Sequence, residues 1–221
     1  TRFFKKEGVP IKVLDTLTTY MLVATIIGAR LGHVFFYDWA YYSQHPIEIL
    51  YVWQGGLASH GAAVGILIAI YILSIVEKRP YLWLMDRIVI VTALGGFLIR
   101  TGNLMNSEIY GHVTDLPWGF VFVRDGMVEP RHPTQIYEAL SYLAIFFYLL
   151  WYYYKKEGKT PNGYLLGMFL ILVFGMRFFI EFLKEVQVAF ENDMILNMGQ
   201  LLSIPLVLGG VYLVINSRKK A

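Results

Sequence analysis

The chain has 221 residues, of which 57% are hydrophobic and only 16% charged, a composition typical of an integral membrane protein rather than a soluble domain. The formal net charge is only +3, so the composition gives no reason to expect a nucleic-acid partner. The absence of cysteine excludes disulfides, thiolate metal sites and a cysteine nucleophile supplied by this chain. A thiol that takes part in a reaction must therefore come from a substrate.

Six segments are apolar enough to cross a membrane. They are predicted at about 13–37, 57–76, 81–99, 138–154, 164–183 and 198–216. A membrane-spanning helix needs roughly 20 residues, because each residue adds about 1.5 Å and the hydrocarbon core is about 30 Å thick. We therefore expect an all-α integral membrane protein with six transmembrane helices, in which residues 1–221 form a single polytopic membrane domain.

Lysine and arginine are concentrated in alternate loops. The basic clusters are Arg2, Lys5, Lys6 and Lys12; Lys78 and Arg79; Lys155, Lys156 and Lys159; and Arg218, Lys219 and Lys220. The remaining loops contain only Arg124, Arg131 and Lys184 outside the helix ends. The positive-inside rule then predicts that both termini of this chain are cytoplasmic.

Several charged or titratable side chains lie inside these apolar segments, namely Arg30, His60, Arg100, Arg177 and Glu181. On the predicted topology Arg30 is about 24 Å and Arg177 about 20 Å from the inner end of its helix, and all five residues fall in the outer third. Charge inside a bilayer is costly and marks a functional site by default. We expect the five to converge on a pocket that holds an anionic lipid head group.

Two readings stay open for the most informative of these residues. Arg177 and Glu181 share a helix face, so they either neutralise each other or Glu181 orients Arg177 toward a phosphate. His60 either bonds to a backbone carbonyl at the start of its helix or accepts a proton from a thiol or hydroxyl.

The outer segment 100–137 is about 38 residues long, and loops of that length are usually functional. Trp118–Val123 is predicted to be a short strand or hairpin arm, and Pro133 to occupy the first position of the next helix. Asn103, Asn106 and Glu108 either close the preceding helix by capping and turn chemistry or form a re-entrant polar turn that contacts a glycerol head group.

Other patterns favour structural roles. The pairs Gly28-x-x-x-Gly32 and Gly61-x-x-x-Gly65 predict close helix packing, and Asp86 with Arg87 is predicted to be a snorkelling or capping pair. The histidines are scattered, without an HxxxH or HExxH spacing, so we expect no metal site.

The run Arg100-x-Gly102-Asn103-x-x-Asn106-x-Glu108-x-Tyr110-Gly111 resembles the signature of the bacterial prolipoprotein diacylglyceryl transferases. Further segments resemble that family in the same order along nearly the whole chain. They are Gly28-Ala29-Arg30-Leu31-Gly32, Gly55-Gly56-x-x-Ser59-His60-Gly61, Arg131-His132-Pro133-Thr134-Gln135-x-Tyr137-Glu138, Arg177-x-x-x-Glu181 and Met198-Gly199-Gln200.

The resemblance implies a reaction and its participants. The diacylglyceryl group of phosphatidylglycerol is transferred to the thiol of the lipobox cysteine in a preprolipoprotein signal peptide, leaving glycerol-1-phosphate, at the outer face of the bacterial cytoplasmic membrane. No cofactor or metal is implied. The expected catalytic residues are His60, Arg100 and Arg177. The expected phosphatidylglycerol-binding residues are Arg30, Arg100, Asn103, Asn106, Glu108, Gly111, Gln135, Tyr137 and Glu181.

The chain also departs from the family pattern. The family has seven spans, so a seventh, carrying a pocket tyrosine, is expected before Thr1, and this chain alone is expected to be inactive without it. Ala62 and Ile99 replace small residues that the family usually has beside the histidine and the arginine. Two rivals remain: an anion transporter, which predicts internal repeats that we do not find, and a non-catalytic protein that binds anionic lipid.

Overall fold

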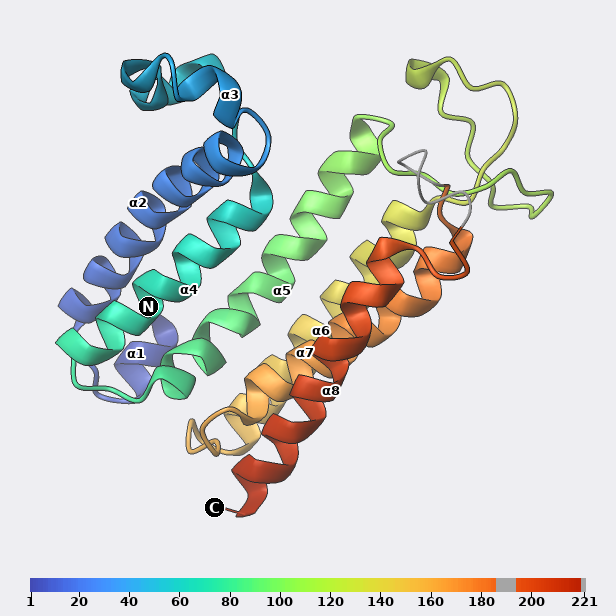
Figure 1. Ribbon diagram of the computed structural model, residues 1–221. Helices are drawn as coiled ribbons and strands as arrows, with labels where there is room; N and C mark the ends of the chain where they lie inside the picture. The colour runs from blue at the N-terminus through green and yellow to red at the C-terminus, as the bar shows by residue number, and fades with distance from the viewer. Residues whose placement is uncertain (186–193, 220–221) are drawn as a thin grey trace. The chain divides into compact units, whose positions relative to one another are not determined.

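The computed structural model describes residues 1–185 and 194–219, and within these ranges it is helical, with isolated bridges but no strand (Figure 1). The α-helices are α1 (Arg2–Lys6), α2 (Ile11–Phe36), α3 (Trp39–Tyr42), α4 (Ser59–Val76), α5 (Tyr81–Met105), α6 (Thr134–Lys155), α7 (Tyr164–Ile180) and α8 (Met198–Lys219). The 3-10 helices are η1 (Pro46–Leu50), η2 (Val52–Gln54), η3 (Val123–Asp125) and η4 (Glu181–Leu183).

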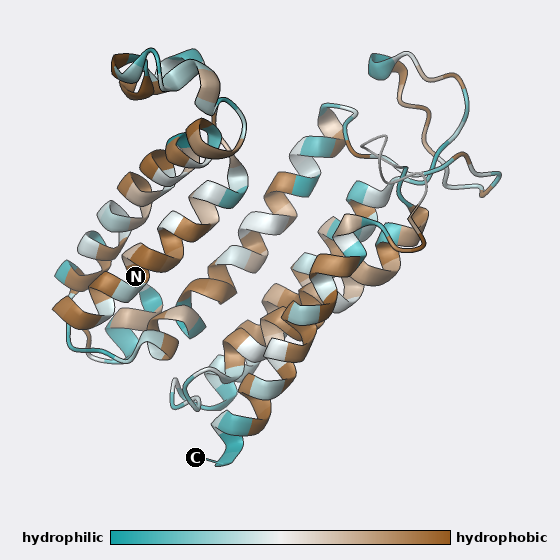
Figure 2. Ribbon diagram, in the orientation of Figure 1, coloured by the Kyte–Doolittle hydropathy of each residue, from teal (hydrophilic) through white to brown (hydrophobic). Residues whose placement is uncertain are grey.

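Six of the described helices are long and apolar enough to cross a membrane: α2, α4, α5, α6, α7 with η4, and α8. Figure 2 shows hydrophobic residues along most of their length and hydrophilic residues toward several of the ends. The predicted all-α architecture with six spans is confirmed. The predicted boundaries of the outer segment were wrong, because α5 continues to Met105 and α6 begins at Thr134.

The chain divides into two compact units, residues 1–84 and residues 85 onward, with α5 beginning in the first and continuing into the second. In the first unit α2 and α4 pack closely through small residues. A Cβ at Gly28 would overlap the carbonyl oxygen of Gly61, and a Cβ at Gly65 would overlap that of Ala24. The predicted close helix packing at these glycines is therefore confirmed.

The second unit contains α6, α7 and α8, with α7 packed against both of the others (Figure 1). The start of α7 is fixed by Asp86, whose fully buried carboxylate accepts hydrogen bonds from the backbone N–H groups of Gly163 and Leu166, each at 2.8 Å. These amides belong to the first turn of α7, where intrahelical acceptors are lacking. Asp86 is thus a capping residue, as predicted, although it caps a different helix from its own.

The outer segment between α5 and α6 forms no strand among the described residues, so the predicted strand at Trp118–Val123 was wrong. Phe120 makes only an isolated bridge with Arg131, because the backbone turns at Gly119, whose N–H donates to Leu116, and again at η3. The predicted position of Pro133 was wrong by one residue, since Pro133 precedes Thr134, the first residue of α6.

Candidate functional site

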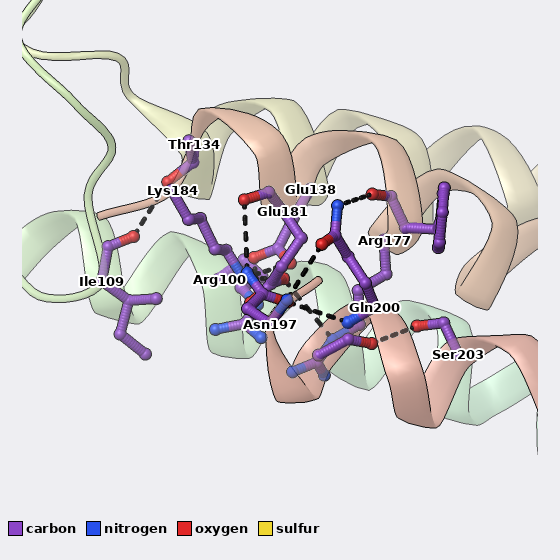
Figure 3. Close-up of polar contacts among 12 residues, drawn as sticks. Arg100, Ile109, Thr134, Glu138, Arg177, Glu181, Lys184, Asn197, Gln200 and Ser203 are labelled. Carbon is purple, nitrogen blue, oxygen red and sulfur yellow. Dashed lines mark hydrogen bonds and ion pairs between the residues drawn. The ribbon is translucent and has the colours of Figure 1, made fainter. Parts of the chain in front are cut away.

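Five charged side chains of the second unit form an alternating chain of ion pairs (Figure 3). Nε of Arg100 lies 2.7 Å from Oε2 of Glu138, and Nζ of Lys184 lies 2.9 Å from Oε1 of the same carboxylate. Lys184 also contacts Glu181 at 3.2 Å, and Glu181 lies 3.8 Å from Nε of Arg177. We call this set, Arg100–Glu138–Lys184–Glu181–Arg177, the charge chain.

Exposure rises from the middle of the charge chain toward its ends. Glu138 is fully buried and the Lys184 side chain is 3% exposed, whereas the side chains of Arg100 and Arg177 are 14% and 34% exposed. The 3.8 Å pair of Arg177 is also longer than a hydrogen bond. Arg177 is therefore the most accessible member of the charge chain. Arg100 and Glu181 are partly exposed, at 14% and 12%, and Glu138 and Lys184 are buried.

Polar groups of the α5 end extend the site from Arg100. Nη1 of Arg100 donates to Oδ1 of Asn103 at 3.1 Å, and Nδ2 of Asn103 donates to Oε2 of Glu108 at 3.0 Å. Asn103 lies within α5, and the N–H of Glu108 donates to its carbonyl at 2.9 Å. The alternative of capping and turn chemistry at the helix end therefore describes this geometry better than a re-entrant turn.

Gln135 anchors the start of α6 to the same turn. Its Nε2 donates to the carbonyl of Glu108 at 2.6 Å, and the neighbouring Thr134 hydroxyl donates to the carbonyl of Ile109 at 2.9 Å. Gln135 is fully buried, yet its Oε1 has no hydrogen-bond partner among the described residues. A buried acceptor without a partner is costly, so the two hydrogen bonds of Gln135 and Thr134 to the turn must offset this cost.

The start of α8 closes the other side of the charge chain. Gly199 lies against Glu181 so closely that a Cβ would meet its carboxylate at 2.5 Å. Asn197 and Gln200 exchange backbone-to-side-chain hydrogen bonds at 2.9 and 3.1 Å, and Gln200 reaches the carbonyl of Phe178 at 3.3 Å. A cavity of about 180 Å³, lined by α5, α6 and α7, borders Arg177.

The three remaining predicted ligands of this unit have other surroundings. Asn106 is exposed, in the turn after α5. Gly111 forms a bridge with Lys184, and a Cβ there would overlap the carbonyl of Leu183. The hydroxyl of Tyr137 accepts from Nε1 of Trp118 at 2.9 Å. The structure supplies a packing reason for Gly111 and places Tyr137 with the outer segment rather than in the charge chain.

His60 lies in the first unit, in the first turn of α4, where it is exposed. Its ring contacts those of Phe36 and Tyr37, with centroids 5.3 and 5.6 Å away. Two hollows meet at His60. One, of about 330 Å³, also has His33, Tyr37 and Ser59 in its wall. The other, of about 700 Å³, is an apolar groove along α2 and α4.

Arg30 also lies in the first unit and is only 3% exposed. Its three guanidinium nitrogens donate to four backbone carbonyls, those of Glu48, Ile49, Gly55 and Gly56, at 2.5 to 3.3 Å. Positive φ angles of 90° and 69° at Gly55 and Gly56 turn the chain there, a conformation natural for glycine. These contacts favour a structural role for Arg30, holding the segment between α2 and α4.

Tyr110 lies among charged side chains in the outer segment. Its hydroxyl donates to Oδ2 of Asp125, and this bond is the main cause that raises the pKa of Tyr110 to about 12. The Tyr110 ring stacks on Phe122, with centroids 4.9 Å apart, and the Arg131 guanidinium lies 5.2 Å from it. Arg131 in turn pairs with Glu185 at 2.7 Å.

Comparison with known proteins identifies the family. Residues 1–216 match the family model described as prolipoprotein diacylglyceryl transferase. The chain belongs to this family. Among its relatives, the phosphatidylglycerol–prolipoprotein diacylglyceryl transferase of Tolumonas auensis is 48% identical over 222 residues, covering 99% of this chain and 84% of the relative. The proteins of that name from Porphyromonas gingivalis and Chloroherpeton thalassium are 46% and 47% identical, covering 99% and 100% of this chain and 82% of each relative.

Two members of the charge chain were missed as site residues by the sequence reasoning, Glu138 and Lys184. Glu138 is the last residue of a segment that resembles the diacylglyceryl transferase family, but the sequence does not show that Arg100 and Lys184 are its ion-pair partners. Lys184 was interpreted as a loop charge, although it follows Arg177 by seven residues and Glu181 by three. Residues at this spacing lie on one helix face, so the pattern Arg177, Glu181, Lys184 was the signal that could have found it.

The arrangement suits the binding of a single negative charge. The charge chain contains three cations and two carboxylates, which leaves one net positive charge at neutral pH. Guanidinium groups match the geometry of phosphate oxygens, and a water-poor surrounding strengthens their attraction. The two ends of the charge chain therefore carry guanidinium groups whose geometry matches that of a phosphate.

Proposed function

We propose that this protein transfers the sn-1,2-diacylglyceryl group of phosphatidylglycerol to the lipobox cysteine of preprolipoproteins, the first step of bacterial lipoprotein maturation. The cysteine sulfur forms a bond to the terminal carbon of the diacylglyceryl group, the carbon that carries the phosphate. The carbon–oxygen bond to phosphate breaks, its electron pair stays on the phosphate oxygen, and the thiol proton goes to a base. The products are a thioether-linked precursor and glycerol-1-phosphate.

The observation that carries the proposal is the pair of accessible arginines on buried ionic supports. Arg100 and Arg177 bind the phosphodiester, and they stabilise the charge that develops on the leaving phosphate. Charged donors that are already oriented are effective because little reorganisation is needed as the bond breaks. Glu138 and Glu181 hold the two guanidinium groups at 2.7 and 3.8 Å.

The polar turn after α5 contacts the glycerol head group in this proposal. The carboxylate of Glu108 accepts a hydrogen bond from a head-group hydroxyl, and the side-chain amide of Asn103, linked to Glu108 at 3.0 Å, donates to another. Asn106 and Gly111 are further proposed contacts of the head group. Gln135 supports the head-group contacts by donating to the carbonyl of Glu108. Tyr137 contacts the head group from the outer segment.

His60 is the proposed base. A free thiol has a pKa near 8.5, so its attack at neutral pH benefits from a proton acceptor, and imidazole is the usual one in this range. The apolar groove along α2 and α4 ends at His60, and its lining suits an acyl chain. Arg30 supports this region by holding the backbone of residues 48–56.

The protein is a multi-pass membrane protein. Its orientation in the membrane and the face on which the active site lies are part of the proposal. Basic clusters mark alternate loops, which favours cytoplasmic termini for this chain and an active site toward the outer face of the bacterial cytoplasmic membrane. Both substrates are membrane-anchored, so lipid and preprotein enter laterally between helices.

A mass-shift assay tests the proposal. Purified full-length protein is mixed with phosphatidylglycerol and a lipobox peptide, and the peptide mass is followed. We expect the mass of a diacylglyceryl group on the cysteine, no gain with a peptide in which serine replaces the cysteine, and a loss of about 10² to 10³ in rate for Arg100→Ala. A folded protein that binds phosphatidylglycerol without a mass gain would instead indicate a non-catalytic lipid-binding protein.

A further inference from the structure

We infer that Lys184 is a positioning residue, which couples Arg100 and Arg177 into one phosphate clamp by bridging the two carboxylates that hold them. The inference rests on the proposed function, because it assigns a role within the same site. It concerns a side chain that lies at the centre of the charge chain rather than at either accessible end (Figure 3).

The first observation is the burial and contact pattern of the ammonium group. Lys184 is the only buried lysine among the described residues, and its side chain is 3% exposed. Its Nζ donates to Oε1 of Glu138 at 2.9 Å and to Oε2 of Glu181 at 3.2 Å. A compact ammonium with three donors can serve two carboxylates at once, so one side chain connects the support of Arg100 with the support of Arg177.

The second observation is that the backbone of Lys184 is fixed from two sides. Its N–H donates to the carbonyl of Glu181 at 3.3 Å, at the end of η4. It also forms a bridge with Gly111, and the N–H of His112 donates to the adjacent carbonyl of Leu183 at 2.9 Å. The absence of a side chain at Gly111 allows this approach, so the ammonium is held by the outer segment as well as by its ionic partners.

Removing the positive charge would change the position of both arginines. Glu138 and Glu181 would then lie near each other with no cation between them, a costly arrangement in a buried setting. Each carboxylate would draw its own arginine inward, so that guanidinium donors now accessible at 14% and 34% exposure would be lost to the ligand. A displacement of about 1 Å in such a site can lower the rate about a hundredfold.

The test compares variants that separate positioning from folding. Lys184→Met removes the charge and keeps a similar length, and Lys184→Arg keeps the charge. Glu185→Gln is the matched control, because it breaks the adjacent 2.7 Å pair with Arg131 and leaves the charge chain intact. For each variant kcat and KM for phosphatidylglycerol are measured per folded molecule, with the folded fraction taken from size-exclusion chromatography and thermal unfolding.

We expect kcat/KM of Lys184→Met to fall about 10- to 100-fold per folded molecule, that of Lys184→Arg to stay within about tenfold of wild type, and that of Glu185→Gln to remain at the wild-type value. A purely structural lysine would change only the folded fraction. Wild-type kcat and KM in the folded part of Lys184→Met would overturn the inference.

A double-mutant cycle gives the sharper readout. Arg100→Lys and Arg177→Lys, alone and together, are compared in the wild-type and Lys184→Met backgrounds. If Lys184 couples the arginines, the effect of the double variant on kcat/KM in the wild-type background differs by about fivefold or more from the product of the two single effects. In the Lys184→Met background it equals that product. Equal coupling in both backgrounds would contradict the inference. Should Lys184→Met not fold, the cycle is run in Lys184→Gln, which removes the charge but keeps a hydrogen-bond donor for the carboxylates.

The same cycle is also measured on phosphatidylglycerol affinity by native mass spectrometry, with phosphatidylcholine as the comparison lipid. A wild-type protein that transfers no diacylglyceryl group would contradict the proposed function, while the affinity cycle would still decide the role of Lys184. Transfer by wild type, together with independent arginines in the affinity cycle, would overturn the inference alone.

Discussion

Arg30 and the pair Arg100 and Arg177 show two ways of placing a guanidinium in a membrane-spanning helix. Arg30 is 3% exposed and donates to four backbone carbonyls. Arg100 and Arg177 pair with carboxylates and remain 14% and 34% exposed. The first arrangement uses the donors to hold the fold, whereas the second neutralises the charge and leaves part of each guanidinium accessible.

The difference shows what an intramembrane arginine needs in order to bind a ligand. Charge in a membrane segment is by default a functional-site hypothesis, and by that criterion the three arginines are equal. The kind of partner separates them, because fixed carbonyls occupy the donors of Arg30, while a buried carboxylate can support an arginine from one side only. We therefore expect mutations in the two regions to affect different quantities.

The largest effect is expected from Glu138→Ala. This change leaves Arg100 and Lys184 without their shared carboxylate in a buried site, and breaking a buried ion pair from one side costs about 3–5 kcal/mol. Chemical unfolding in detergent micelles measures the loss. Glu185→Gln, which alters an exposed carboxylate at 43% exposure, is the control and should cost less than about 1 kcal/mol. Equal costs would contradict the buried role of Glu138.

The next effect distinguishes the arginines directly. Arg30→Ala removes the donor for four carbonyls and should lower the free energy of unfolding by about 2–3 kcal/mol. Arg100→Ala should lower it by about 1 kcal/mol, because Glu138 keeps its contact with Lys184. The two unfolding curves are recorded in the same micelles. A larger cost for Arg100→Ala would remove the contrast between the two regions.

A smaller effect is expected at the contact of α2 with α4. A Cβ at Gly61 would overlap the carbonyl oxygen of Gly28, so Gly61→Ala forces the helices apart and should cost about 1–3 kcal/mol. Gly95→Ala is the matched control in α5, since a Cβ there meets nothing within 4 Å. Similar thermal stability of the two variants would contradict the close packing of α2 and α4.

The smallest effect concerns pH. The hydrogen bond to Asp125 raises the pKa of Tyr110 from 10.0 to about 12. A raised pKa means that the folded protein holds the proton more tightly, so the stabilisation is complete below pH 10 and is lost between about pH 10 and 12. Ultraviolet titration of tyrosinate, as a difference between wild type and Tyr110→Phe, isolates this group. In Asp125→Asn the difference titration should move toward pH 10, and an unchanged midpoint would rule out Asp125 as the cause.

Much of the fold could be predicted, because long apolar segments and clustered basic residues report directly on membrane crossing. The helices were found within a few residues at most ends. The end of α5 was misplaced because polar residues such as Asn103 were taken to end the helix, whereas α5 continues to Met105. The strand at Trp118–Val123 was wrong because alternating polarity does not reveal the turn at Gly119.

The site was predictable only in part, for a physical reason. The depth of Arg100 and Arg177 in their helices follows from sequence, and so does the shared face of Arg177 and Glu181, which pair at 3.8 Å. The partners of Arg30 are carbonyls whose direction depends on the backbone angles of Gly55 and Gly56, and periodicity carries no signal for these. The bridge from Lys184 to Glu138 joins residues 46 positions apart, so only the packed structure reveals it.

The most direct test of the account is the rate of diacylglyceryl transfer by Arg177→Ala, the variant at the most exposed end of the charge chain. Full-length wild-type and variant proteins are given phosphatidylglycerol and a lipobox peptide, and the peptide mass is followed over time with folded protein in equal amounts. We expect the variant to stay folded and its transfer rate to fall about 10²- to 10³-fold. Transfer at the wild-type rate by the folded variant would contradict the claim that the charge chain presents Arg177 to the phosphate.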